Sequence, residues 1–171
     1  LSLAFLALLA VPAVAIEIDP VEQPLLHEIA GRVSADELHA TIAQLVGFGT
    51  RHTLSDTKSA RRGIGAARRW VKSRFEAFSK ACGGCLEIVT PAQTFTGKRI
   101  PQPAEVMDVV AIQRGTADPD RVIVITGHLD SRRTDVMVAK GDAPGANYDG
   151  SGTAALIEAA PVLSRYRFRT I

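Results

Sequence analysis

A short run of β-branched residues that ends in a histidine and an aspartate constrains this chain most. Residues 122–125 read Val-Ile-Val-Ile, and the chain continues as Thr-Gly-His-Leu-Asp-Ser to Ser131. An unbroken run of this kind suits a strand buried on both faces, as in the sheet of an α/β protein. Ligands bind at the carboxyl ends of such strands. We therefore expect an α/β fold whose sheet delivers His128 and Asp130 to a binding site.

The spacing of these two residues favours a metal site. His128 and Asp130 are two positions apart, so their side chains point the same way in an extended chain. A metal-binding imidazole usually gives its other N–H to a carboxylate, which fixes the tautomer and orientation of the ring. An ordinary hydrogen-bonded pair of histidine and aspartate has the same spacing, so the pair alone does not decide between the two readings.

A glycine-rich segment follows at residues 143–155, which read Ala-Pro-Gly-Ala-Asn-Tyr-Asp-Gly-Ser-Gly-Thr-Ala-Ala. It is expected to be a loop that runs into a helix over residues 153–160, with Ser151 as the cap. Small residues let the backbone approach a site closely, and the N-terminus of a helix adds positive potential. A loop that serves only as a turn is the alternative interpretation.

The rest of the chain shows the pattern of a mixed helical and strand domain. Ser34 and Glu37 form a capping box for a helix that ends at Gly47 and Gly49. A longer helix is expected from Thr57 to Lys80, because apolar residues recur every three or four positions: Ile64, Ala67, Val71, Phe75 and Phe78. Residues 86–95 and 105–113 are rich in Val, Ile and Thr and are expected to be strands.

Composition and charge narrow the class of partner. The 171 residues are 46% apolar and 22% charged, which is typical of a globular protein. Twenty basic and 18 acidic residues leave a net charge of +2, too balanced for a nucleic-acid binder. The basic residues of the long helix are interpreted as a solvated face, with a nucleic-acid or membrane surface as the alternative: Arg61, Arg68, Arg69, Lys72 and Arg74.

The N-terminus and the cysteines indicate export. Residues 1–16 are almost wholly apolar, but a membrane span needs about 20 such residues. Residues 1–15 suit a signal peptide that lacks its start Met, with a buried helix or a retained anchor as alternatives, and residues 16–33 are expected to be an N-terminal segment.

Cys82 and Cys85 are the two cysteines, and in an oxidising compartment they are expected to form a disulfide. Free thiols and a redox or metal-binding pair are the alternatives. We expect a periplasmic or secreted protein without a stable membrane span.

Three blocks of the sequence resemble one enzyme family. They are Gly-His-Leu-Asp-Ser at 127–131, Ala-Pro-Gly-Ala-Asn at 143–147 and Asp-Gly-Ser-Gly-Thr-Ala-Ala at 149–155. The chain resembles the co-catalytic zinc exopeptidases, which include bacterial leucyl aminopeptidases and glutamate carboxypeptidase. Residues 49–52 (Gly-Thr-Arg-His) and the helix after them are also similar to the family. The resemblance implies a three-layer sandwich with a mixed, mostly parallel sheet between helices, of which residues 34–171 are the N-terminal, truncated part.

The resemblance also implies roles for residues of the site. His128 is then a zinc ligand and Asp130 orients its ring. The family uses an Asp in the glycine-rich loop to bridge two zinc ions, and that position is occupied here by Tyr148. A carboxylate can bind one ion with each oxygen, whereas a phenol has a single oxygen and an unperturbed pKa of about 10. Asp149 is adjacent and substitutes for the bridging residue only if the loop twists.

Other parts of the family's catalytic set are missing from these 171 residues. The family follows the loop with a Glu-Glu pair, whose first member is the general base, and with a further Asp and a late His. This sequence contains no adjacent Glu pair. Its other histidines, His27, His39 and His52, all precede the expected sheet. The general base is therefore absent, and zinc binding is expected to be weak or absent.

The resemblance implies a zinc-dependent exopeptidase of aminopeptidase type that acts on peptides, here as an incomplete and inactive chain. Complete members use two zinc ions. One alternative is a non-catalytic remnant or exported binding module. The other is an enzyme similar to glutaminyl cyclase, which has a single zinc. The sequence indicates neither the substrate preference nor the oligomeric state.

Overall fold

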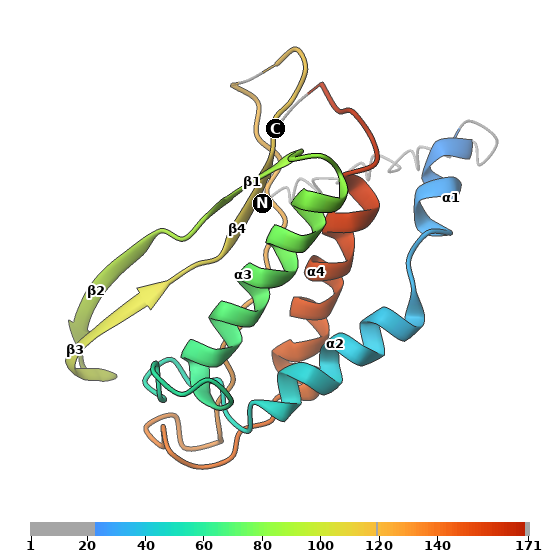
Figure 1. The fold of residues 1–171 in the computed structure, drawn as a ribbon. Coiled ribbons are helices and arrows are strands. Elements are labelled where there is room, and N and C mark those ends of the chain that lie inside the picture. The colour runs from blue at the N-terminus through green and yellow to red at the C-terminus, as the bar shows by residue number, and fades with distance from the viewer. Residues whose placement is uncertain (1–22, 119, 170–171) are drawn as a thin grey trace, which may run out of the picture.

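Helices and strands are combined in one α/β domain, described by a computed structural model for residues 23–118 and 120–169 (Figure 1). The helices are α1 (Pro24–Ala30), α2 (Ala35–Gly47), α3 (Gly63–Ala81) and α4 (Ser151–Leu163), and a short π-helical turn, η2 (Ala146–Gly150), precedes α4. The strands are β1 (Leu86–Val89), β2 (Ala92–Gly97), β3 (Ile100–Met107) and β4 (Val110–Gln113). The predicted α/β class is confirmed. The predicted signal peptide at residues 1–15 lies outside the described residues, as do residues 16–22 of the predicted segment 16–33.

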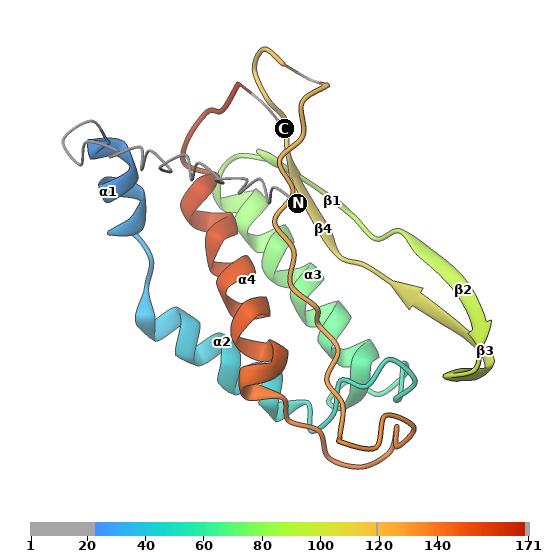
Figure 2. The ribbon, with the colours of Figure 1, turned by 180° about the vertical axis from the view of Figure 1, so that it is seen from behind.

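The strands form two antiparallel two-stranded sheets, which follow one another along a bent ribbon (Figure 1). β1 pairs with β4 and β2 pairs with β3, both antiparallel, and β1 leads into β2 as β3 leads into β4. The hairpin of β2 and β3 extends away from the helices (Figures 1 and 2). The expectation of a mostly parallel sheet between two helical layers does not hold for the described residues. Strands joined by a short turn pair antiparallel, whereas a parallel pair needs a long crossover connection.

Residues 122–125 are not the buried strand that their sequence predicted. They run extended but unpaired, and 58%, 66%, 73% and 54% of the surfaces of Val122, Ile123, Val124 and Ile125 are exposed. An apolar groove separates this segment from β4 and is lined by residues 122–129 on one side and 106–113 on the other. The β-branched composition still favours extended backbone, but no neighbouring strand within the described residues covers it.

Helix α2 begins as its sequence predicted. Ser34 has extended backbone, and its hydroxyl accepts a hydrogen bond from the N–H of Glu37 at 3.2 Å. This bond satisfies one of the N–H groups that the first helical turn leaves without a partner. The helix ends at Gly47 and buries Leu45 completely.

Helix α3 begins at Gly63, six residues later than the predicted start at Thr57. The carboxylate of Asp56 accepts hydrogen bonds from the N–H groups of Lys58 (2.6 Å) and Ser59 (2.8 Å), which close a turn in place of a helical start. The chain then enters the helix through Gly63 at φ +84°, where a Cβ atom would lie 2.3 Å from the carbonyl oxygen of Asp56. The side-chain hydrogen bonds of Asp56 therefore compete successfully with the helix.

The predicted apolar stripe of α3 forms most of the core. Val71 and Phe75 pack with Ile157 of α4, while Ala66 and Ala67 pack with Leu45 and Phe48. Arg68 does not lie on the solvated face predicted for it, because only 7% of its surface is exposed and its guanidinium lies 3.4–3.5 Å from the carbonyl oxygen of Glu105. Burial lowers the pKa of Arg68. Arg68 is therefore an interior residue, unlike the solvent-facing position predicted for it.

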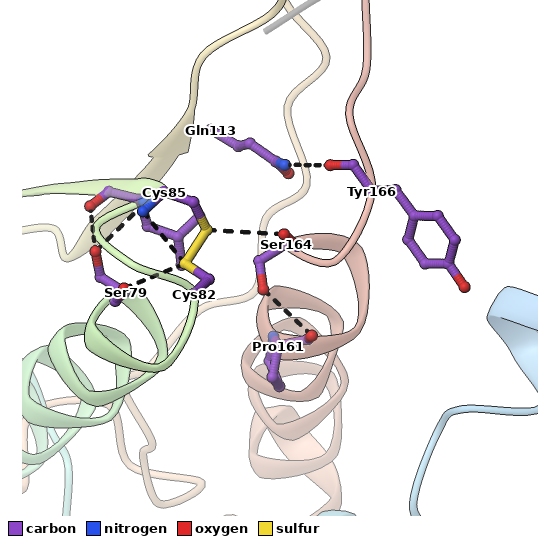
Figure 3. The surroundings of a disulfide bond; sticks show 8 residues. Ser79, Cys82, Cys85, Gln113, Pro161, Ser164 and Tyr166 are labelled. Carbon is purple, nitrogen blue, oxygen red and sulfur yellow. Dashed lines mark hydrogen bonds between the residues drawn. A yellow bond between two sulfur atoms is a disulfide. The ribbon is translucent and has the colours of Figure 1, made fainter.

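A disulfide joins Cys82 at the end of α3 to Cys85 before β1 (Figure 3). Gly83 and Gly84, both at positive φ, form the turn between them. The hydroxyl of Ser79 donates to the carbonyl of Leu86 and accepts from its N–H. The turn is therefore tied to α3 by covalent and hydrogen bonds. Within the described residues, no helix is both long enough and apolar enough to cross a membrane.

We predict that Phe75→Ala lowers the free energy of unfolding by about 3–5 kcal/mol, because truncating a buried aromatic ring loses apolar burial and leaves a cavity. Phe75 is 3% exposed in the core between α3 and α4. Urea unfolding followed by circular dichroism measures the change. Phe95→Ala is the matched control, because Phe95 lies on the exposed hairpin and 42% of its surface is accessible. This substitution should lower the free energy of unfolding by less than about 1 kcal/mol. Equal costs would contradict this assignment of the core.

Candidate metal centre

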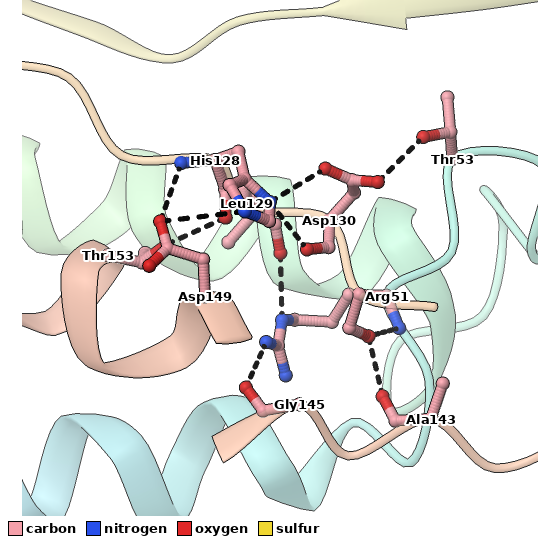
Figure 4. A network of polar contacts seen from close by, with 10 residues as sticks. Arg51, Thr53, His128, Leu129, Asp130, Ala143, Gly145, Asp149 and Thr153 are labelled. Carbon is pink, nitrogen blue, oxygen red and sulfur yellow. Dashed lines mark hydrogen bonds and ion pairs between the residues drawn. The ribbon is translucent and has the colours of Figure 1, made fainter. Parts of the chain in front are cut away.

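The imidazole of His128 lies between the carboxylates of two aspartates. Its Nδ1 is 3.1 Å from Oδ1 of Asp130 and 3.1 Å from the carbonyl oxygen of the same residue. Its Nε2 is 3.9 Å from Oδ2 of Asp149 (Figure 4). Asp130 follows along the same extended segment, whereas Asp149 comes from η2, so the site joins two separate parts of the chain.

The contacts of Nδ1 decide the tautomer of His128. Both partners of Nδ1 are acceptors, so the neutral ring carries its proton on Nδ1 and donates it to Asp130. The lone pair of Nε2 then points to the side of Asp149. This is the tautomer in which a histidine can bind a metal ion through Nε2. About two fifths of each side chain is exposed, so solutes reach the pair.

Further hydrogen bonds hold both ends of the pair. Thr53 donates from its hydroxyl to Oδ2 of Asp130 at 3.3 Å, and Thr153 of α4 donates to the carbonyl of His128 at 3.0 Å. The backbone N–H of His128 donates to Oδ2 of Asp149 at 3.1 Å. These bonds orient the segment that carries the imidazole against the start of α4.

Gly152 leaves the space that the Asp149 carboxylate occupies. A Cβ atom at position 152 would lie 2.3 Å and 2.7 Å from the two carboxylate oxygens. Gly145, at the start of the same loop, has a φ of +52°, a backbone conformation that residues with a side chain disfavour. The loop therefore turns Asp149 toward His128. Asp149 thereby presents its carboxylate to the same side of the site as Nε2 of His128.

Tyr148 lies beside the imidazole of His128. Its ring packs edge-on against the His128 ring, with centroids 4.8 Å apart and planes at 64°. The residue is 63% exposed. The contact supports the orientation of the imidazole through aromatic packing. The nearest carboxylate of the loop to His128 is thus that of Asp149.

The remaining histidines lie outside this site. His27 is exposed on α1 and His39 is exposed on α2. His52 is buried, with Nδ1 accepting from the N–H of Leu54 and Nε2 lying 3.0 Å from the carbonyl oxygen of Val136. Both ring nitrogens of His52 are therefore engaged in structural hydrogen bonds. Within residues 23–118 and 120–169, no group of three or more His, Cys, Asp or Glu side chains could hold a metal ion.

Sequence reasoning assigned no role to Arg51, although it noted the Gly-Thr-Arg-His segment. The side chain of Arg51 is completely buried beneath the site. Its guanidinium donates to the carbonyl oxygens of Leu129 (2.8 Å), Pro144 (2.7 Å), Gly145 (3.0 Å) and Leu45 (2.8 Å). Burial lowers the pKa of Arg51, and the charges of Asp130 and Asp149 act in the opposite direction.

Ser131 extends this buried network. Its hydroxyl accepts from the N–H of Arg51 at 2.9 Å and donates to the carbonyl of Ala143 at 2.5 Å. Ala143 in turn forms a parallel bridge with Thr50. The segments 49–52, 127–131 and 143–150 therefore meet at one buried point under His128 and Asp149. These are the segments that the family resemblance singled out.

In a comparison with models of protein families, residues 108–170 match Peptidase family M28. Residues 108–170 belong to peptidase family M28. M28 is the family of co-catalytic zinc aminopeptidases and carboxypeptidases, so the predicted resemblance is confirmed.

Curated relatives extend the similarity over most of the chain. A probable zinc metalloprotease of Leptosphaeria maculans is 42% identical over 152 residues, which cover 88% of this chain and 35% of that protein. Proteins of the same description from Pyricularia oryzae and Phaeosphaeria nodorum are 43% and 37% identical and cover 83% and 85% of this chain. The chain spans 28–35% of the lengths of these three relatives. Their names support zinc as the metal of these relatives.

Proposed function

We propose that this chain contributes part of the zinc site of an M28 exopeptidase of aminopeptidase type, acting on peptides near a terminus. The observation that carries the proposal is the His128 imidazole, with Nδ1 directed to Asp130 and Nε2 facing the carboxylate of Asp149. The separation of 3.9 Å between Nε2 and Oδ2 allows one cation to contact both atoms, since zinc bonds to nitrogen and oxygen ligands are about 2.0–2.2 Å long.

The residues present fit a zinc site in part. Catalytic zinc usually has three protein ligands and one open position. His128 and Asp149 supply two donors, and Asp130 steadies the imidazole from behind. When bound, zinc would acidify a water molecule and polarise the scissile carbonyl. The two-ion arrangement of the complete family needs a bridging carboxylate, for which we propose Asp149 in place of Tyr148.

We propose further that the chain by itself is inactive. A general base must accept a proton from the attacking water, and the sequence has no adjacent Glu pair to supply one. Glu158 is the acidic residue within α4, but it is 7% exposed and accepts a hydrogen bond from the N–H of Ser34 at 2.8 Å. Its carboxylate is committed to joining α4 to the start of α2.

Export to the periplasm or the exterior is part of the proposal. It is supported by the apolar residues 1–15 of the sequence and by the Cys82–Cys85 disulfide, because disulfides persist in oxidising compartments.

The groove beside residues 122–125 supports a proposal about the fold of longer family members. We propose that one further strand fills this groove and completes a three-layer sandwich with a mostly parallel sheet. The groove lies between two extended segments, and its walls are rich in Val and Ile. Phe168 lines it, and residues 116–118 donate hydrogen bonds to the carbonyls of residues 168–169, so the chain after α4 returns to the groove's edge.

We predict weak zinc binding through His128. The two-donor site should retain well below one zinc per chain after dialysis, as measured by elemental analysis. Zinc titration of the 171-residue chain should shift the ring signals of His128 in NMR spectra, and His128→Ala should remove this binding. His39→Ala, which changes an exposed histidine on α2, is the matched control. Stoichiometric zinc, or binding that survives His128→Ala, would sink this assignment.

We predict no detectable hydrolysis of an aminoacyl chromogenic amide by the purified 171-residue chain with added zinc, because the base and further ligands are missing from its sequence. The Leptosphaeria maculans relative, assayed in parallel, tests whether the amide suits the family. A zinc-dependent rate that His128→Ala abolishes would show that this chain is itself an enzyme.

Hydrogen exchange tests the proposed strand. The amides of residues 122–125 should exchange rapidly in this chain, because these residues have no strand partner here. The aligned amides of the Leptosphaeria maculans relative should exchange at least a hundredfold more slowly if a further strand pairs with them. Amides of Val71 and Phe75 in the core helix serve as protected references. Rapid exchange at the aligned residues of the relative would refute the completed sheet.

A further inference from the structure

Arg51 joins the two segments that carry the metal-binding pair. It donates to the carbonyl of Leu129, which lies between His128 and Asp130, and to the carbonyl of Gly145, where the loop that carries Asp149 begins (Figure 4). A single rigid guanidinium therefore contacts the backbone on both sides of the site. Its planar fork fixes direction as well as distance.

The third anchor of Arg51 is the end of α2. Its Nη1 donates to the carbonyl of Leu45, in the last turn of that helix, which also accepts from the N–H of Phe48 at the C-cap. The negative end of the helix dipole also favours a cation there. Arg51 is thereby anchored to a helix of the core. The segments that carry His128 and Asp149 are therefore fixed relative to α2 as well as to each other.

The hydrogen-bond partners of Arg51 indicate that the residue holds backbone segments in place. Its four side-chain hydrogen bonds within the described residues all go to backbone carbonyls, and none goes to a carboxylate. Burying a guanidinium is costly unless its donors are satisfied. The donors of Arg51 keep their carbonyl partners only while all three segments stay in place. The burial of Arg51 and the arrangement of the site therefore depend on each other.

We propose that Arg51 is a positioning residue that fixes the separation of the His128 imidazole and the Asp149 carboxylate, and through it the affinity of the pair for zinc. The first part stands on the contacts of Arg51, and the second rests on the function proposed above. Arg51 touches neither side chain of the pair and acts through the backbone at Leu129 and Gly145.

Arg51→Lys in the 171-residue chain tests this role. A lysine ammonium has three donors on one nitrogen and cannot reach four carbonyls in three segments. Arg68→Lys is the matched control, because Arg68 is also buried and also contacts a backbone carbonyl, at Glu105, but has no hydrogen bond to either ligand segment. Thermal unfolding reports stability, NMR of the His128 ring reports the Nδ1–H bond, and titration with Zn²⁺ alone reports affinity.

The expected result separates positioning from stability. Both variants should unfold at lower temperature. Arg51→Lys should also shift the Nδ1–H signal of His128 and weaken zinc binding by about 10–100-fold, as changes behind a metal ligand do. Arg68→Lys should leave the ring signal unchanged and the zinc affinity within about twofold of the unmodified chain. A folded Arg51→Lys chain with the ring signal and affinity of the unmodified chain would overturn the inference.

Two further outcomes are also decisive. If the unmodified chain binds no zinc at His128, the proposed function fails, and the ring signal of Arg51→Lys alone decides the positioning role. If Arg51→Lys does not fold, Ser131→Ala loosens the same junction by removing one oxygen atom, which accepts from Arg51 and donates to Ala143. An unchanged His128 signal in Ser131→Ala would then count against the inference.

Discussion

The site depends on one buried cation. Arg51 is completely removed from solvent, and its guanidinium is solvated by carbonyl oxygens in place of water. Those carbonyls come from the end of α2, from the segment that carries His128 and from the loop before α4. A charge in the interior is tolerated only with good hydrogen-bonding geometry. The requirement that Arg51 be satisfied therefore brings together segments that include residues up to 94 positions from Arg51 in sequence.

Two kinds of contact position the proposed metal-binding pair, His128 and Asp149. The hydrogen bond of His128 to Asp130 is local and follows from the extended backbone between them. The approach of Asp149 is not local, because it needs the turn at Gly145, the space left by Gly152 and the docking of α4 on the core. The family membership of residues 108–170 agrees with this division, since the matched region contains both halves of the pair.

An exposed, unpaired segment lies next to the His128–Asp149 pair within the described residues. The extended residues 122–125 face an apolar groove, and they lead directly to His128. A strand in that groove would shield the apolar walls and stiffen the segment that carries the imidazole. The three relatives match this chain over only 28–35% of their own lengths, so they contain much further sequence that could supply strands and ligands.

Much of the local structure could be predicted from the sequence. The capping box at Ser34, the apolar stripe of α3 and the pairing of His128 with Asp130 each depend on neighbours within a few residues. The start of α3 was predicted too early, because the side-chain hydrogen bonds of Asp56 override the helical pattern of the residues that follow. The β-branched run predicted a buried strand, but residues 122–125 are exposed and pair with no strand within the described residues, because burial also requires a neighbour, which a run of β-branched residues does not supply.

The sequence by itself determined which residues could form helices and strands and which histidine could have a carboxylate behind it. These properties depend on backbone preference and on short spacings. The tertiary structure alone decided that Asp149, and not Tyr148, presents a carboxylate to Nε2, that Arg68 is buried, and that Arg51 joins three segments. Such contacts link positions tens of residues apart, and they are set by how helices and loops pack, which no local pattern specifies.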